Sequence, residues 1–113
     1  MNETLKAVVI EVTGENVRNH DIYLRGAFGL FPDDCFGGGT ERARGAPITV
    51  QIGGESVETD IDEGNAIFRE RAAVQRYFEE ERVSEGDLIV IERLQPREFQ
   101  MWKASKRGFK YYL

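Results

Sequence analysis

The stretch Asn65–Leu94, NAIFRERAAVQRYFEEERVSEGDLIVIERL, contains a short strand, a helix and a long strand in succession. The residues AIF predict the short strand, and LIVIERL is the most strand-like segment of the chain. Between them, RERAAVQRYFEEER predicts a helix, because Val74, Tyr77 and Phe78 recur at helical spacing and form one apolar face. We expect this helix to end near Val83, before a turn at EGD.

Similar short strands and turns extend on both sides of this stretch. Residues 6–12, KAVVIEV, and residues 20–24, HDIYL, predict two strands, with a turn at TGEN between them. PITVQIGGESVETDI predicts a hairpin, because Gly53–Gly54 suits the positive φ angles of tight turns. FQMWK is expected to pair with LIVIERL. RGAFGLFPDDCFGGG predicts a short helical turn that carries four apolar side chains into the core, namely Phe28, Leu30, Phe31 and Phe36.

These elements amount to roughly seven short strands, with turn signals about every 8–12 residues, and one or two short helices. The pattern predicts a mainly β fold with short helices, arranged as a barrel or a sandwich. The chain has 113 residues, with no internal repeat and no linker, so we expect a single domain over residues 1–113. The sequence leaves open whether residues 103–113 form a tail or an additional strand.

Composition predicts the compartment. No apolar run is long enough to cross a membrane, and the amino-terminal MNETLKAVVIEV lacks the features of a secretory signal. Cys35 is the only cysteine, so no internal disulfide can form. These features predict a protein of the reducing cytoplasm that does not contact a membrane.

The charge is negative overall but unevenly distributed. The formal net charge is −5, from 15 Lys and Arg against 20 Asp and Glu, which argues against a non-specific coat on DNA. Carboxylates concentrate in residues 55–63 and 79–87, whereas basic side chains gather in residues 18–25, 42–44 and 69–76 and in the tail KASKRGFKYYL. Nucleic-acid binding depends on such local groups rather than on the net charge.

The chain offers few groups for catalysis. Its only histidine, His20, would have to pair with Cys35 for thiolate chemistry, but Cys35 in DDCFGG is better interpreted as a small core residue. One Cys and one His are too few for a zinc site. Asp33 and Asp34 lack the acidic-x-Lys partner typical of metal-dependent nucleases and are better interpreted as the start of a short helix. We therefore predict no enzymatic activity, no cofactor and no metal.

Arginine and asparagine gather in two segments, GENVRNHDIYLR and DEGNAIFRER, each beside a predicted strand. Arg can bond guanine O6 and N7 with two donors, and Asn can bond adenine N6 and N7. Both residue types also contact phosphates. If a rigid barrel presents the two segments at one rim, they form a nucleic-acid recognition surface. Ordinary solvated turns are the alternative interpretation.

The order of elements resembles the B3-type DNA-binding pseudobarrel over about residues 7–103. NAIFRERAAVQRYFEEERVSEGDLIVIERL is similar to the carboxy-terminal half of that family, and TGENVRNHDIYLRGAFGLFP is similar to the first half. The family includes plant transcription factors and the recognition domains of bacterial restriction endonucleases, and this chain is similar to the bacterial members. The resemblance implies a seven-stranded open β-barrel with two arms that clamp the DNA major groove.

The resemblance also implies which residues contact DNA. Its two arms correspond to residues 16–23 and 62–71. The implied contacts are Asn16, Arg18, Asn19, His20, Tyr23, Arg25, Asn65, Arg69 and Arg71, with Lys6, Arg42, Arg44 and Lys103 as weaker backbone candidates. A departure is that Asp62 and Glu63 open the second arm, where carboxylates repel phosphates, although they can also accept from cytosine N4.

The resemblance implies a non-catalytic protein that binds double-stranded DNA. Such a domain would be the recognition component of a restriction or regulatory system, beside a nuclease or methyltransferase partner. The alternative is a protein-interaction module whose acidic surface binds a basic partner.

Overall fold

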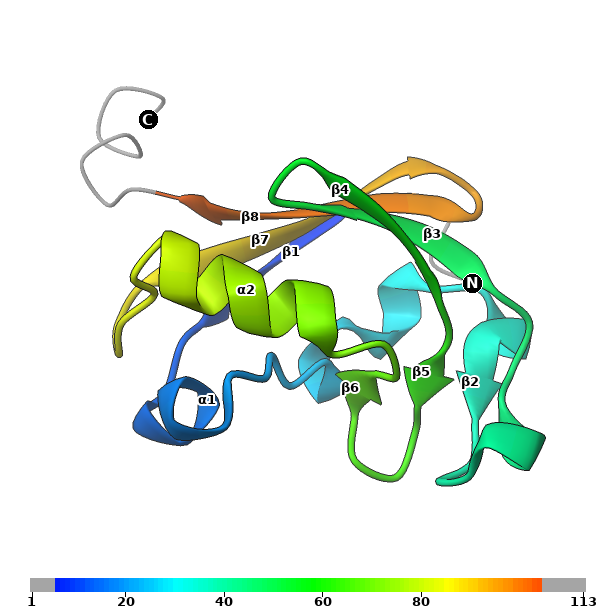
Figure 1. Cartoon of the computed structure of the whole chain (residues 1–113). Coiled ribbons are helices and arrows are strands. Elements are labelled where there is room, and N and C mark those ends of the chain that lie inside the picture. The colour runs from blue at the N-terminus through cyan, green and yellow to red at the C-terminus, as the bar shows by residue number, and fades with distance from the viewer. Residues whose placement is uncertain (1–5, 105–113) are drawn as a thin grey trace.

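In the computed structural model, which describes residues 6–104, the strands form two sheets (Figure 1). The five-stranded sheet has the order β1-β7-β8-β3-β4, and the three-stranded sheet has the order β2-β5-β6. The mainly β fold with short helices is therefore confirmed. The elements are β1 (Ala7–Glu11), α1 (Gly14–Asn19), η1 (Arg25–Leu30), η2 (Asp33–Cys35), β2 (Phe36–Gly37), η3 (Glu41–Ala43), β3 (Ile48–Ile52), β4 (Glu55–Thr59), β5 (Ile61–Asp62), β6 (Ile67–Phe68), α2 (Ala72–Glu80), β7 (Leu88–Gln95) and β8 (Glu98–Ala104).

The larger sheet is organised around β7, which pairs antiparallel with both β1 and β8. The expected pairing of LIVIERL with FQMWK is confirmed as the β7–β8 pairing. β8 also pairs with β3, and this pairing is parallel. Since side chains alternate between the two faces of a strand, the sheet has an inner face toward α2 and an outer face on the opposite side (Figure 1).

The β3–β4 hairpin is confirmed, and Gly53–Gly54 forms its turn. Both glycines have positive φ, 57° and 86° respectively. Gly53 also lies against the ring of Tyr77, where a Cβ atom would come within 2.8 Å of a ring carbon. Glycine is therefore required at position 53 for its backbone angle and for the close approach of α2.

The hydrophobic core lies between the inner face of the larger sheet, α2 and the segment of η1 and η2. Val74, Tyr77 and Phe78 are buried, as the helical spacing predicts. Phe31 connects the layers, because its ring centroid lies 4.7 Å from that of Phe99 and 5.9 Å from that of Phe68.

Helix α2 ends at Glu80, earlier than the predicted end near Val83. Arg82 takes a left-handed conformation with φ of 49°. The backbone N–H of Val83 donates to the carbonyl of Phe78, and the N–H of Arg82 donates to that of Glu79. These two bonds form a Schellman-type helix end, which closes the helix before the buried Val83 enters the core.

Two local predictions are wrong. Residues 20–24 form no strand, and TGEN is not a turn but part of α1. Thr13 caps this helix, because its hydroxyl accepts from the backbone N–H of Asn16 while the Asn16 side chain accepts from the backbone N–H of Thr13. After α1, the buried Ile22 and Leu24 lie on either side of the half-buried Tyr23. This alternation of burial resembles that of a strand. The backbone N–H of Leu24, however, donates to an isolated carbonyl, that of Ala66, rather than to a ladder.

The barrel is not confirmed. Residues 6–104 form eight strands in two separate sheets, and no closed barrel is found among them. Of the segment 103–113, Lys103 and Ala104 belong to β8, and the remainder lies outside the described residues. Within residues 6–104, no helix combines the length and the apolar character needed to cross a membrane.

Candidate functional site

The two segments expected to be arms lie side by side (Figure 1). The backbone N–H of Leu24 donates to the carbonyl of Ala66 over 2.7 Å, which joins the end of the first segment to the turn before β6. Arg71 makes a second connection, because its Nη2 donates to the carbonyl of Asn19 over 3.4 Å. The structure therefore brings together residues that are about fifty positions apart in the sequence.

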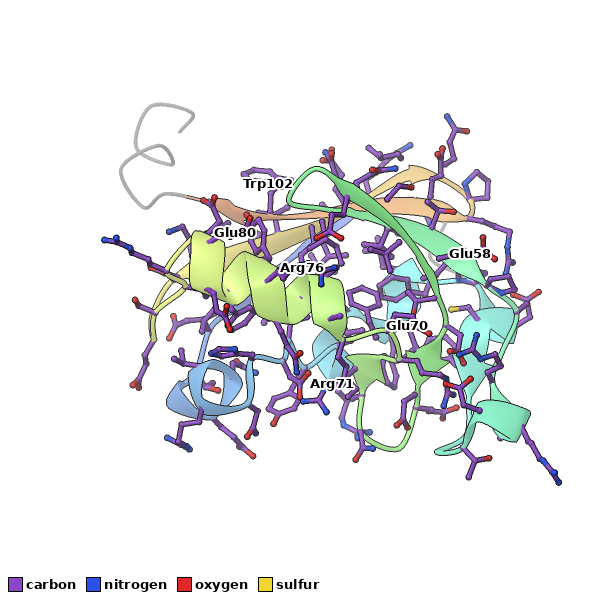
Figure 2. All side chains as sticks on the ribbon, viewed as in Figure 1. Glu58, Glu70, Arg71, Arg76, Glu80 and Trp102 are labelled. Atoms are coloured by element: carbon purple, nitrogen blue, oxygen red, sulfur yellow. The ribbon has the colours of Figure 1, made fainter. Side chains whose placement is uncertain are left out.

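Arg71 and Asp21 form the strongest link between the segments. The Nε and Nη2 atoms of Arg71 each donate to a different carboxylate oxygen of Asp21 over 2.9 Å. The Asp21 side chain is buried, whereas that of Arg71 remains 44% exposed. Figure 2 shows Arg71 on the side of the molecule that carries α1. The outer edge of its guanidinium can therefore meet a ligand while the inner edge holds Asp21.

Asn16 is buried in the cap of α1. Its Oδ1 atom accepts from both the backbone N–H and the hydroxyl of Thr13, at 2.8 and 2.9 Å. Its Nδ2 atom is buried too and has no hydrogen-bond partner. Asn16 therefore shapes the helix and presents no polar atom at the surface.

The exposed or half-buried polar side chains of the first segment include Arg18, Asn19, Tyr23 and Arg25. The Asn19 side-chain nitrogen donates to the Tyr23 hydroxyl over 2.9 Å, and no described residue donates to the Asn19 side-chain oxygen. Arg25 lies over the Phe28 ring, with 5.8 Å between its guanidinium carbon and the ring centroid. In the described part of the chain, neither Arg18 nor Arg25 pairs with a carboxylate. Both cations are therefore available to an anionic ligand.

His20 ends α1 with a left-handed backbone, at φ of 52°. Its ring lies 5.9 Å from that of Phe78, and its Nδ1 atom is 3.7 Å from a carboxylate oxygen of Glu79. The imidazole thus connects the first segment to α2 and keeps about a third of its surface open.

The second segment contributes a rigid turn between β5 and β6. Asp62 is buried, and its carboxylate accepts from the side-chain amide of Asn65 at 2.9 Å and from the Asn65 backbone N–H at 3.3 Å. Ala66 closes the turn with φ of 59°, and its N–H donates to the Asp62 carbonyl over 2.8 Å. Asn65 is exposed at the tip. The Asp62 charge, expected to face phosphates, is instead used inside the turn, whereas Glu63 is exposed.

Arg69 is held inside the protein. Its side chain is 8% exposed, and its Nε and Nη2 atoms donate to both carboxylate oxygens of the buried Asp60 at 2.6 and 3.0 Å. The guanidinium also donates to the carbonyls of Gly38 and Thr40. Every nitrogen of Arg69 therefore has a protein partner, and the residue fastens the loop before β3.

Burial alone would raise the pKa of Asp60. The hydrogen bonds from Arg69 and from the backbone N–H of Gly45, together with the positive charges of Arg69 and Arg44, outweigh burial and lower that pKa below its usual value. The hydrogen bond to Asp60 and the negative charge of that carboxylate raise the pKa of Arg69. Both groups are therefore charged at neutral pH.

Glycines make this close approach of the loop possible. A Cβ atom on Gly37 would lie 2.5 Å from both the backbone nitrogen of Gly45 and a carboxylate oxygen of Asp60. One on Gly45 would lie 2.6 Å from the carbonyl carbon of Cys35. The sequence FGGGTERARG is thus a tightly packed loop around the Asp60–Arg69 pair.

Two of the four weaker backbone candidates, Arg44 and Lys103, have partners within the protein. Arg44 pairs with Glu41 and Glu70, and the Lys103 amine donates to the carbonyl of Glu81. Lys6 and Arg42 are exposed.

Two of the groups considered for catalysis, Cys35 and Asp34, have structural surroundings. Cys35 is fully buried, and burial raises the pKa of its thiol to about 12, so it carries no thiolate at neutral pH. Asp34 receives a hydrogen bond from Arg97. Across residues 6–104, no group of three or more His, Cys, Asp or Glu side chains is placed to hold a metal ion.

Three structural residues escaped sequence analysis, namely Thr13, Asp21 and Asp60. Thr13 had a local signal, because a Thr followed three positions later by an amide matches the pattern of a helix cap. Asp21 and Asp60 had none, since their arginine partners lie 50 and 9 positions further along the chain.

No family model, no curated protein and no solved structure matches this chain. The site is therefore interpreted from its own geometry.

Proposed function

We propose that the chain binds double-stranded DNA without catalysis, through a surface that we call the arm surface. Its contact residues are Arg18, Asn19, His20, Tyr23, Arg25, Asn65 and Arg71. The observation that carries the proposal is the junction of the two segments through Leu24–Ala66 and Arg71–Asp21. Such a junction keeps polar side chains from two distant segments at a fixed spacing, which base readout requires.

The roles of these residues follow from their surroundings. Arg18 and Arg25 retain their full charge, so they are assigned to phosphates or to guanine. Asp21 offsets the charge of Arg71, which makes Arg71 a donor of directed hydrogen bonds rather than a source of net attraction. Asn19 and Asn65 have open side-chain oxygens that can accept from an exocyclic amine of a base. Asn16 and Arg69, which are buried, support the surface and do not contact DNA.

The two sheets would then act as an open, B3-like pseudobarrel that works in the cytoplasm. The loops at one edge form the arms, and the sheets hold them rigid. Glu63 and Glu15 are exposed in or near the arms, and their repulsion of phosphates weakens non-specific binding. This favours a domain that gains affinity from base contacts or from a nuclease or methyltransferase partner.

A salt-dependent titration tests DNA binding. We would measure the anisotropy of a labelled duplex of randomised sequence at several salt concentrations. The logarithm of the binding constant should fall linearly with the logarithm of the salt concentration. In the double variant Arg18→Ala/Arg25→Ala, the salt slope should decrease by roughly one for each phosphate that the variant no longer neutralises.

A matched variant separates local contacts from net charge. Arg76 lies on the exposed side of α2, paired with Glu55, and is not part of the arm surface. Two single variants, Arg76→Gln and Arg18→Gln, make the same change in net charge. If both lower the affinity equally, or if the wild-type chain shows no salt-dependent binding, the arm surface is not a DNA site.

A further inference from the structure

The outer face of the larger sheet carries a row of apolar side chains across three strands. In the strand register, Val9 of β1 is opposite Val90 of β7, and Val90 is opposite Trp102 of β8. Val9 is 49% exposed and Trp102 is 40% exposed. Val90, which lies between them in the register, is buried. Figure 2 shows Trp102 on the side of the sheet away from α2. Large apolar residues in an exposed row are typical of a surface that another molecule covers.

Four carboxylates lie on the rest of this face, among uncharged side chains. One row, next to the apolar one, contains Glu92, Gln100 and Gln51 in register across β7, β8 and β3. In a further row, Thr49 of β3 lies between Glu98 and Glu58. Glu11 of β1 completes the set on the other side of the apolar row. The outer face therefore changes from apolar to acidic over a few strand positions.

No cation compensates these carboxylates on the face itself. Because side chains alternate along a strand, the outward positions are every second residue of β1, β7, β8, β3 and β4. Within residues 6–104, none of those outward positions is Lys or Arg. The Lys103 side chain belongs to the inner series and reaches the end of α2, where its amine donates to the Glu81 carbonyl.

We propose that the outer sheet face is a docking site for a basic polypeptide segment that also carries apolar side chains. We call this face the outer-face site, formed by Val9, Val90 and Trp102 with Glu11, Glu58, Glu92 and Glu98. Lysine or arginine side chains of the partner meet the carboxylates, while its apolar side chains cover the Val9–Trp102 row. The charge of the face selects this partner, since nucleic-acid phosphates would be repelled.

A second copy of the chain fits this face poorly. In a two-fold symmetric dimer, the same patch meets itself, so four carboxylates would face four more. The site is also independent of the proposed DNA binding. The arm surface lies on the opposite side of the molecule (Figure 1), so both ligands can bind together. A basic partner would then be carried to DNA without competing for it.

The site contains its own reporter, because Trp102 is the only tryptophan of the chain. We would titrate the full-length protein with the peptide KVKFKVK, which carries basic and apolar side chains and no tryptophan. Binding should move the Trp102 emission to shorter wavelength as the indole loses water. The peptides EVEFEVE and KSKSKSK, which lack the charge or the apolar groups, should produce a much smaller change.

Charge reversals locate the binding face. In the variant Glu58→Lys/Glu98→Lys, affinity for KVKFKVK should fall by about tenfold. The control Glu80→Lys/Glu85→Lys changes the net charge equally but lies away from the outer face, so its affinity should stay the same. Figure 2 labels Glu58 and Glu80. Val9→Ser, an exposed change that leaves the core intact, should also weaken binding.

Three results would overturn the proposal. One is an emission shift of equal size with EVEFEVE. Another is an equal loss of affinity in both double charge variants. The third is a Trp102 emission that depends on protein concentration and not on peptide, with a dimer in sedimentation equilibrium, which would assign the face to a second copy.

Discussion

Arg69 donates to both carboxylate oxygens of Asp60, over 2.6 and 3.0 Å, while both side chains are almost completely buried. The pair lies between the small sheet and the loop before β3, and it also binds the backbone of that loop through Gly38, Thr40 and Gly45. The resemblance implies that Arg69 contacts DNA, but in the structure Arg69 connects internal segments of the protein. We therefore expect it to stabilise the domain.

Replacing one member of this pair should be costly. Arg69→Ala leaves the Asp60 carboxylate buried without its cationic partner and with only the Gly45 N–H as a donor. Such a change costs about 3–5 kcal/mol of folding free energy. Urea denaturation followed by circular dichroism measures the difference. Because a domain of this size has a total stability of about 5–15 kcal/mol, the variant is expected to be severely destabilised.

Two further variants keep this prediction testable if Arg69→Ala does not fold. Asp60→Asn/Arg69→Met removes both charges, so it should be more stable than Arg69→Ala alone. Arg76→Ala breaks the exposed pair with Glu55 and should change stability little, because surface ion pairs are weak. If Arg69→Ala behaves like Arg76→Ala, Asp60 and Arg69 are not a structural pair.

The same pair predicts a pH dependence of stability. The pKa of Asp60 is lowered in the folded state relative to an unfolded value of about 3.9. As pH falls, the unfolded chain therefore takes up the proton first. The stabilisation is fully present above the unfolded pKa and is lost as pH falls through it toward the folded pKa. Arg69, whose pKa is raised, stays charged throughout.

Asp60→Asn isolates this contribution from the other carboxylates. The difference in unfolding free energy between wild type and Asp60→Asn should be constant above about pH 5 and shrink below it. Other groups with lowered pKa, such as Glu55, titrate in both proteins and cancel in the difference. A difference that stays constant down to pH 3, which is about one unit below the unfolded pKa, would contradict the assignment.

Sequence patterns predicted the elements that are specified locally. The β3–β4 hairpin depends on Gly53–Gly54, and the face of α2 depends on the spacing of Val74, Tyr77 and Phe78. Both signals lie within a few residues of the structure they specify. In the small sheet, the strand expected at AIF corresponds to β6. The β2–β5 pairing had no local signal, because Phe36–Gly37 pairs in parallel with Ile61–Asp62, and only the tertiary fold brings these segments together.

The candidate site was predictable in its composition but not in its burial. The two segments expected to be arms lie adjacent, yet their polar residues divide into exposed and internal ones. Asn16 and Arg69 carry the same side chains as surface readers of DNA, and sequence gives no measure of what covers them. Their partners decide the role, and for Arg69 that partner is a carboxylate in residues 55–63, a segment with several acidic residues and no basic one.

Alanine substitutions at three glycines of the loop around Asp60 should differ sharply in their effect on stability. Gly37→Ala and Gly45→Ala would place a Cβ atom within 2.6 Å of backbone atoms, so the loop must shift and stability should fall by about 3 kcal/mol. Gly39→Ala meets no atom within 4 Å, and its φ is not positive, so its stability should change by less than about 0.5 kcal/mol. Thermal unfolding of the three variants measures this contrast. Equal effects at positions 37 and 39 would be inconsistent with the packing described.

Helix α2 offers a stabilising substitution. Arg82 occupies the left-handed position of the helix end at φ of 49°, a conformation that costs a residue with a Cβ atom about 1–2 kcal/mol. Glycine adopts this conformation freely but loses more backbone freedom on folding. Arg82→Gly also removes a cation from the negative end of the helix, so the net gain in stability should be about 0.5 kcal/mol.

Arg82→Ala is the matched control, because it removes the same charge and keeps the Cβ atom. It should be no more stable than wild type, and Arg82→Gly should unfold at a higher urea concentration than either. Asn tolerates the left-handed region better than Ala does, so Arg82→Asn should lie between the two variants. If Ala and Gly have the same midpoint, the backbone at residue 82 stores no strain, and the helix end depends on the buried Val83 instead.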